Sequence, residues 1–183
     1  MIKKLHTILE NIIVSKWGPS LKKTISKVFP DSYKINIITN MPKLKTWEKK
    51  QEKSFPVFKT RFELHEYIQK QFLQDKSVDY LEFGVFEGAT INFWINLNKN
   101  PKSRFYGFDT FTGLPEEWKN LIGHRPISTW NCKGDLPEIN DERVQFFKGL
   151  FQDTIDEFLE NYDPQKNIVI HNDSDLYSSS LYL

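Results

Sequence analysis

Two helical repeats of apolar residues open the chain. Such residues recur every three or four positions within 5–13 and again within 21–29, and Gly18-Pro19 separates the two runs. This spacing places the apolar side chains on one face of a helix. We therefore expect a helical hairpin, followed by a charged and solvent-exposed connector at 47–53. Together they predict an α-helical N-terminal segment, residues 1–58, that serves as a lid or as a surface for homo-oligomerisation.

From residue 59 onward, short apolar runs typical of buried strands alternate with helical patterns. A helix should precede the first strand, with one face made of Leu64, Tyr67, Ile68 and Phe72. We expect strands at 78–83, 104–109, 144–148 and 167–171, and helices at 89–97 and 154–162. In the first of these helices, Ile91, Trp94 and Ile95 should face the sheet. Such alternation indicates an α/β fold, a Rossmann-like parallel sheet with helices on both faces, over residues 59–183.

Composition restricts the possible binding partners and the cellular compartment of the protein. The formal net charge is +1, so no overall field favours nucleic acid or a membrane. The six lysines within 1–30 form a locally basic region, for which a solvated helix face is favoured over a membrane-surface helix. No apolar run approaches the roughly 18 residues of a spanning helix. The single cysteine, Cys132, favours a reducing compartment, and we expect a cytoplasmic protein.

A glycine-containing turn follows the first predicted strand. It reads Glu82-Phe83-Gly84-Val85-Phe86-Glu87-Gly88 and leads into a helix that begins near Thr90. Glycines at such a turn let the backbone approach a ligand, and the free N–H groups at the helix start can receive a carboxylate. Glu82 could accept a hydrogen bond from an ammonium group. The alternative is that the glycines serve only a tight turn.

Asp109 ends the second predicted strand, about 20 residues beyond the glycine turn. A carboxylate at this spacing can accept hydrogen bonds from two neighbouring ribose hydroxyls. Alternatively, Asp109 caps the turn at 110–115. The glycine turn lacks the middle glycine of the dinucleotide pattern, and Glu87 would repel a pyrophosphate, which counts against NAD. A ligand with an adenosine end, an amino-acid end and no phosphate, such as S-adenosylmethionine, fits better.

A third group of polar residues follows the last predicted strand, in the run His171-Asn172-Asp173-Ser174-Asp175. Two carboxylates at this spacing can hold Mg²⁺ together with waters and substrate oxygens. Alternatively, one carboxylate binds the metal while the other accepts a proton. His171 is a reserve candidate for the general base. The competing interpretation is that Asp173, Ser174 or Asp175 caps a helix that begins near Ser178.

These motifs, taken in order, resemble those of the class I S-adenosylmethionine-dependent methyltransferases of the macrocin O-methyltransferase type. The resemblance runs from about Arg61 to the end of the chain and rests on four segments: 82–88, 107–115, 148–154 and 171–177. It implies methyl transfer from S-adenosylmethionine to a hydroxyl of a small molecule, such as a sugar or a natural product, with Mg²⁺ assistance.

The resemblance also implies the roles of individual residues. The cofactor would contact Glu82, Gly84, Gly88 and Thr90, with Asp109 on its ribose. Asp173 would bind the metal, and Asp175 would be a candidate for the catalytic base.

One departure from that family lies at the end of the sequence, because relatives continue beyond the position of Leu183 with further strands and acidic metal ligands. We therefore expect a fragment of a longer protein or a truncated relative completed by a partner. Two alternative functions stay open. One is a non-catalytic, methyltransferase-like binding module, and the weaker one is a nicotinamide-dependent oxidoreductase.

Overall fold

The structure, a computed structural model, describes residues 33–51, 56–119 and 124–183. The chain divides into two compact units, Met1–Pro56 and Val57–Leu183. The apolar repeats expected to form a helical hairpin lie outside the described residues, so the hairpin stays a prediction. Within the described part of the chain, no helix has both the length and the apolar character needed to cross a membrane.

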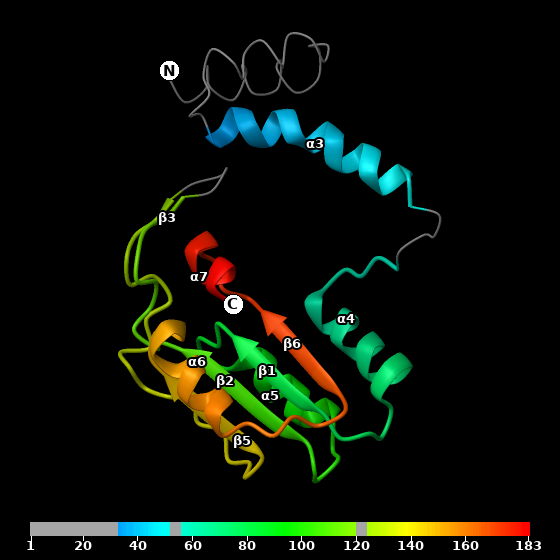
Figure 1. Cartoon of the computed structure of the whole chain (residues 1–183), viewed down its shortest axis with the longest axis vertical. Helices are drawn as coiled ribbons and strands as arrows, with labels where there is room; N and C mark the ends of the chain where they lie inside the picture. Colours follow the sequence, from blue (N-terminus) through cyan, green and yellow to red (C-terminus); the bar gives the residue numbers. More distant parts are fainter. Residues whose placement is uncertain (1–32, 52–55, 120–123) are drawn as a thin grey trace. The chain divides into compact units, whose positions relative to one another are not determined.

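The described part of the first unit is one helix, α3 (Tyr33–Lys49) (Figure 1). Pro42 lies inside it, and the Thr46 hydroxyl donates to the Pro42 carbonyl at 2.8 Å. The predicted connector at 47–53 is wrong for its first three residues, because α3 continues to Lys49. Lysine and glutamate have high helix propensity, so a charged run is compatible with a helix as well as with a connector.

A four-stranded parallel sheet forms the centre of the second unit (Figure 1). Its strand order is β5-β2-β1-β6, and the strands are β1 (Asp79–Phe83), β2 (Arg104–Asp109), β5 (Val144–Lys148) and β6 (Ile168–Asn172). The α/β fold and the four predicted strands are confirmed, with boundaries shifted by at most one residue. A short antiparallel pair, β3 (Trp118–Lys119) and β4 (His124–Arg125), was not predicted, because two-residue strands leave no periodic pattern.

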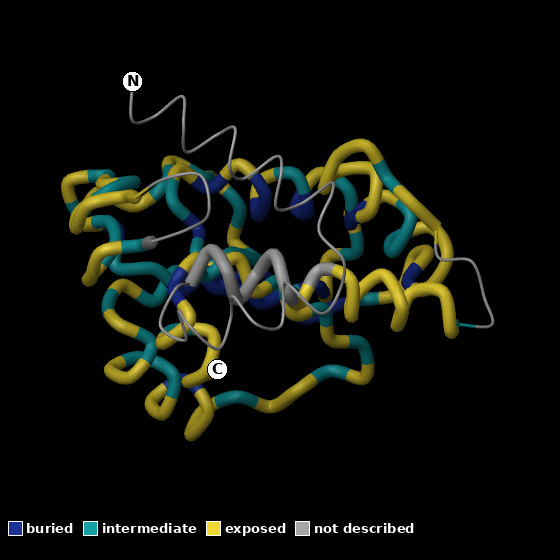
Figure 2. Tube along the Cα trace, turned by 90° about the horizontal axis from the view of Figure 1, so that it is seen from above, coloured by how far each residue is buried: buried dark blue, intermediate teal, exposed yellow. Residues whose placement is uncertain are grey.

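Alternate residues of the strands build two apolar layers, one on each face of the sheet. On one face, Tyr80 and Phe105 pack with Trp94 of α5 (Ala89–Leu97). On the other, Leu81 and Phe108 belong to a cluster with Phe158 of α6 (Phe151–Glu160). In Figure 2 the buried segments gather in the interior of this unit, between exposed loops. The two-sided sheet is confirmed, as is the inward face of α5, where Ile91, Trp94 and Ile95 are buried.

The helix before β1 was predicted correctly and its inward face in part, since Ile68 packs against the core as expected. It consists of α4 (Arg61–Ile68) and a π-helical turn, η1 (Gln69–Leu73). Leu64 and Phe72, both expected to face the core, are 40% and 62% exposed, whereas His65 and Leu73 are buried. A π-helical turn holds more residues than an α-helical one, so η1 brings Leu73 instead of Phe72 to the core. His65 precedes this turn and is buried against Trp94.

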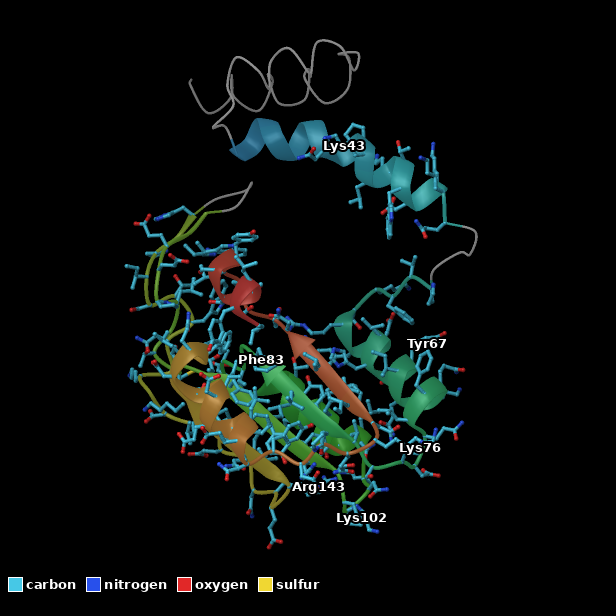
Figure 3. The ribbon with its side chains drawn as sticks, in the orientation of Figure 1. Lys43, Tyr67, Lys76, Phe83, Lys102 and Arg143 are labelled. Carbon is cyan, nitrogen blue, oxygen red and sulfur yellow. The ribbon has the colours of Figure 1, made fainter. Side chains whose placement is uncertain are left out.

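The strands run from an amino-end cluster of polar contacts towards loops at their carboxyl ends. At the amino end, Arg143 donates through its guanidinium to the carbonyls of Ile95, Asn98 and Asn100, which closes the C-terminal end of α5. Figure 3 shows Arg143 and Lys102 at the end of the sheet opposite Phe83. At the carboxyl end, the loop after β6 leads into α7 (Tyr177–Tyr182), one residue earlier than expected from the sequence.

Candidate functional site

A cavity of about 740 Å³ lies at the carboxyl ends of the strands. This is the edge of an open α/β sheet at which ligands bind, and the volume falls in the range of small-molecule sites. Among the residues predicted from the sequence, those that line the cavity are Glu82, Gly84, Thr90, Asp109, Asp173 and Asp175. Gly88 and His171 are not among its lining residues. Three motifs far apart in the sequence therefore share one cavity.

Gly84 connects two of these motifs through its backbone. Its φ of +94° is in the left-handed region, and a Cβ at this position would lie 2.6 Å from the Asp173 carbonyl oxygen. The Asp173 amide in turn donates to the Phe83 carbonyl at 2.9 Å. The glycine is thus needed to bring the loop after β6 against the turn after β1, as well as for any approach to a ligand.

Asp109 organises the same turn with its carboxylate. Its Oδ2 accepts the backbone N–H groups of Val85 and Phe86 at 2.8 and 2.9 Å, and its Oδ1 accepts that of Phe111 at 2.7 Å. Each carboxylate oxygen has two lone pairs. Oδ2 is therefore fully used, whereas the second position on Oδ1 is taken only by a long contact of 3.5 Å from the Thr110 hydroxyl, which one ribose hydroxyl could replace. Asp109 lines the cavity as expected, but the bidentate acceptance predicted from the sequence requires that this turn rearrange.

Glu82 is the most buried carboxylate of the cavity, with 1% of the residue exposed. Burial raises its pKa to about 8, although the Tyr80 hydroxyl donates to its Oε2 at 3.0 Å. A carboxyl group in this state gains most from a cationic partner, which favours its charged form. The position of Glu82 is consistent with the predicted contact to an ammonium group.

His171 takes part in a buried polar network behind Glu82. Its Nδ1 lies 3.0 Å from the Tyr80 hydroxyl and 3.9 Å from Glu82 Oε1. Its ring also meets the ring of His65 edge to face, and His65 accepts a hydrogen bond from the Trp94 indole. Burial lowers the pKa of both histidines, that of His65 to about 4. These contacts favour a role for His171 in positioning Tyr80 and Glu82, and its role as a base stays a prediction.

Asp173 forms an ion pair that the sequence did not indicate. Arg61, the first residue of α4, donates from Nη1 to Asp173 Oδ2 at 2.7 Å. Over the described ranges, no group of three or more histidine, cysteine or acidic side chains is arranged to hold a metal ion. Magnesium assistance therefore stays a prediction from the resemblance.

Asp175 lines the cavity two residues beyond Asp173. Burial raises the pKa of its carboxyl group, and the charge of Asp173 acts in the same direction. A carboxylate with a raised pKa accepts a proton more readily, so this position is suited to general-base chemistry. The alternative of helix capping is not supported, because α7 has no side-chain cap.

Several lining residues were missed by the sequence analysis. Arg61 and Phe62 come from the start of α4, and Thr129 and Trp130 come from the segment after β4. No motif marks these positions, since they reach the cavity only through the tertiary fold. Tyr80 could have been found, because residues two apart in a strand point to the same face and Tyr80 precedes Glu82 by two.

Comparisons with known proteins leave the family unassigned: no protein-family model matches the chain, and the curated proteins include no significant match. The similarity to macrocin-type methyltransferases thus rests on the quoted motifs alone.

Proposed function

We propose that this chain binds S-adenosylmethionine and belongs to a methyltransferase acting on a hydroxyl group of a small molecule. One observation supports the proposal above all. The cavity at the carboxyl ends of β1 and β2 brings together the Gly84 turn, the buried Glu82 carboxyl group and Asp109, the three features expected to receive an adenosine and an amino acid.

The charge of the cavity favours this ligand over a dinucleotide. Its described lining carries six carboxylates and, among cationic side chains, only Arg61. The carboxylates are Glu82, Glu87, Asp109, Glu116, Asp173 and Asp175. A field of this sign attracts a sulfonium cation and repels the two phosphates of a nicotinamide dinucleotide. The oxidoreductase alternative is correspondingly weaker.

When bound, S-adenosylmethionine supplies a methyl group that an acceptor oxygen attacks as the carbon–sulfur bond breaks. The chain's part is to hold the reactants and to receive a proton. Glu82 would hold the ammonium group, and Asp175 would take the hydroxyl proton of the acceptor, as its raised pKa favours. The acceptor would enter on the side of Asp175, where Ser178 and Ser179 also line the cavity.

A second candidate function is cofactor binding without turnover. Its support is that Asp173 is ion-paired with Arg61 and that His171 is turned to Tyr80, so two of the residues implied for catalysis have other partners. Such a module would bind S-adenosylmethionine as tightly as an enzyme does. It would differ in transferring no methyl group to any hydroxyl acceptor.

Isothermal titration calorimetry with S-adenosylmethionine tests the proposal, with NADH as the control ligand. We expect micromolar binding of S-adenosylmethionine and none of NADH. Binding of NADH alone would replace the proposal by the oxidoreductase alternative. If S-adenosylmethionine binds, transfer of a radiolabelled methyl group to a panel of sugars and phenols separates the enzyme from the binding module.

A further inference from the structure

Arg61 is the single cationic side chain in the described lining of a cavity that is otherwise rich in carboxylates. A guanidinium in such surroundings can accept an anionic group of a ligand through direct charge attraction, which no other side chain of the described lining offers. S-adenosylmethionine carries one such group, the carboxylate of its amino-acid part. The charge distribution of the cavity therefore restricts where this carboxylate can lie.

The backbone at Arg61 is fixed by the start of a helix. Thr60 is the N-cap of α4, and its hydroxyl accepts the Glu63 N–H at 3.2 Å. From this position Nη1 of Arg61 reaches Asp173 Oδ2. Across the described ranges this is its one side-chain hydrogen bond, and a guanidinium has five N–H donors in a planar fork. The remaining donors can serve a carboxylate of the ligand.

Arg61 and Glu82 place a cation and a buried acid, which a cationic partner would ionise, in the same cavity. Burial is the main influence on the pKa of Glu82 and raises it, whereas the charge of Arg61 acts in the opposite direction. The guanidinium and the carboxyl group thus lie within electrostatic reach of one another. The guanidinium can bind the carboxylate of an amino acid while the carboxyl group of Glu82 binds its ammonium group. Together the two side chains are complementary to a zwitterion.

We propose that Arg61 is a specificity-determining residue that binds the carboxylate of the amino-acid part of S-adenosylmethionine. This inference rests on the proposed function. Without ligand, Asp173 holds the guanidinium beside the cavity. With ligand, the carboxylate accepts hydrogen bonds from the fork, a geometry that arginine offers and lysine does not.

Decarboxylated S-adenosylmethionine is the probe that isolates this contact, because it lacks the carboxylate and keeps the adenosine, the sulfonium and the amine. We expect the wild-type chain to bind S-adenosylmethionine more tightly than the decarboxylated compound. In Arg61→Gln that preference should fall by about tenfold or more, through weaker binding of S-adenosylmethionine alone. Arg61→Lys should keep part of it.

Arg125→Gln is the matched control, because it removes the same charge from an exposed position of β4 that does not line the cavity. This variant should prefer S-adenosylmethionine over the decarboxylated compound as strongly as the wild type does. Equal weakening of both ligands in Arg61→Gln, or an unchanged preference, overturns the role of Arg61 while leaving the proposed function standing. Failure of the folded wild-type chain to bind either compound overturns the proposed function and this inference together.

Discussion

Arg104 holds the carboxylate of Asp79 at two points, from Nε to Oδ1 at 2.7 Å and from Nη2 to Oδ2 at 2.6 Å. Asp79 is fully buried at the start of β1. It also accepts hydrogen bonds from the Tyr162 hydroxyl and from the backbone and side-chain amides of Gln165. This carboxylate therefore joins β1, β2 and the segment that leads into β6 at the amino end of the sheet.

Replacing Asp79 by asparagine should destabilise the fold. The new amide places donors opposite the donors of Arg104 and Gln165, and breaking a buried ion pair typically costs about 3 kcal/mol or more. Urea denaturation of Asp79→Asn measures the loss. Asp156→Asn, at an exposed position of α6, makes the same chemical change and should alter the unfolding free energy little. Equal stability of the two variants would contradict the structural role of Asp79.

The same carboxylate should make the fold sensitive to acid. Burial alone would raise the pKa of Asp79, but the hydrogen bonds from Arg104, Gln165 and Tyr162 outweigh it and hold the pKa below 3.8. The unfolded chain then binds the proton more readily than the folded one. This stabilisation is complete above the unfolded pKa and is lost as pH falls through the folded value. Acid unfolding followed by circular dichroism should show a weaker pH dependence in Asp79→Asn.

Glu82 should produce the opposite slope at higher pH. Burial raises its pKa from 4.5 to about 8, so the folded chain keeps a proton that the unfolded chain releases. Stability from this group is present below pH 4.5 and declines as pH rises towards 8. The stability of Glu82→Gln relative to wild type should therefore increase over this interval. Glu157→Gln, at an exposed position of α6, should show no such trend.

Tyr80 should affect ligand binding through Glu82. If the proposed function holds, Tyr80→Phe weakens the binding of S-adenosylhomocysteine by roughly threefold to tenfold, the loss of one hydrogen bond that orients Glu82. Methylthioadenosine, which lacks the amino-acid part, should bind unchanged. Tyr162→Phe is the control, because it also removes a hydroxyl that donates to a buried carboxylate, that of Asp79. It should lower stability without changing the ratio of the affinities for S-adenosylhomocysteine and methylthioadenosine. An unchanged ratio in Tyr80→Phe would refute the orienting role.

Gly84→Ala should lower both stability and ligand affinity. Alanine at a φ of +94° is strained, and its Cβ would meet the Asp173 carbonyl, a backbone atom that cannot move alone. A cost of about 1–3 kcal/mol is expected from the strain, with the clash in addition. Gly134→Ala is the matched control, because its φ of +82° is similar and its Cβ would meet only the flexible tip of Lys148. A smaller effect at Gly84 than at Gly134 would contradict this account.

The parallel sheet was predictable because its strands carry strong local signals. The apolar run around Leu81 and the one around Phe108 are short, continuous and bounded by turn residues, as buried strands are. The inward position of Leu73 was not predictable, because periodicity assumes α-helical geometry and η1 departs from it. The burial of His65 depends on Trp94, a partner 29 residues away along the chain.

The candidate site was predictable where its residues follow strands directly. Glu82 and Asp109 lie at the carboxyl ends of parallel neighbouring strands, and such ends meet at one edge of the sheet. Their partners were not predictable, because Arg61 reaches Asp173 across 112 positions of sequence and no motif marks that distance. The hydrogen bonds from backbone amides to both Asp109 oxygens were not predictable either, because every non-proline residue carries a main-chain donor and residue type does not mark which one is used.

The place of β6 at the edge of the sheet has a consequence for motion around the cavity. Alternate amides of a parallel strand point to opposite sides, so half of those in β6 face away from β1, where the described residues place no neighbouring strand. These amides can exchange hydrogen for deuterium without any opening of the sheet, whereas those of the fully buried β1 exchange only when the sheet opens. We therefore expect the loop that carries Asp173 and Asp175 to follow the strand of lower protection, on the side of the cavity where exchange is faster than at β1.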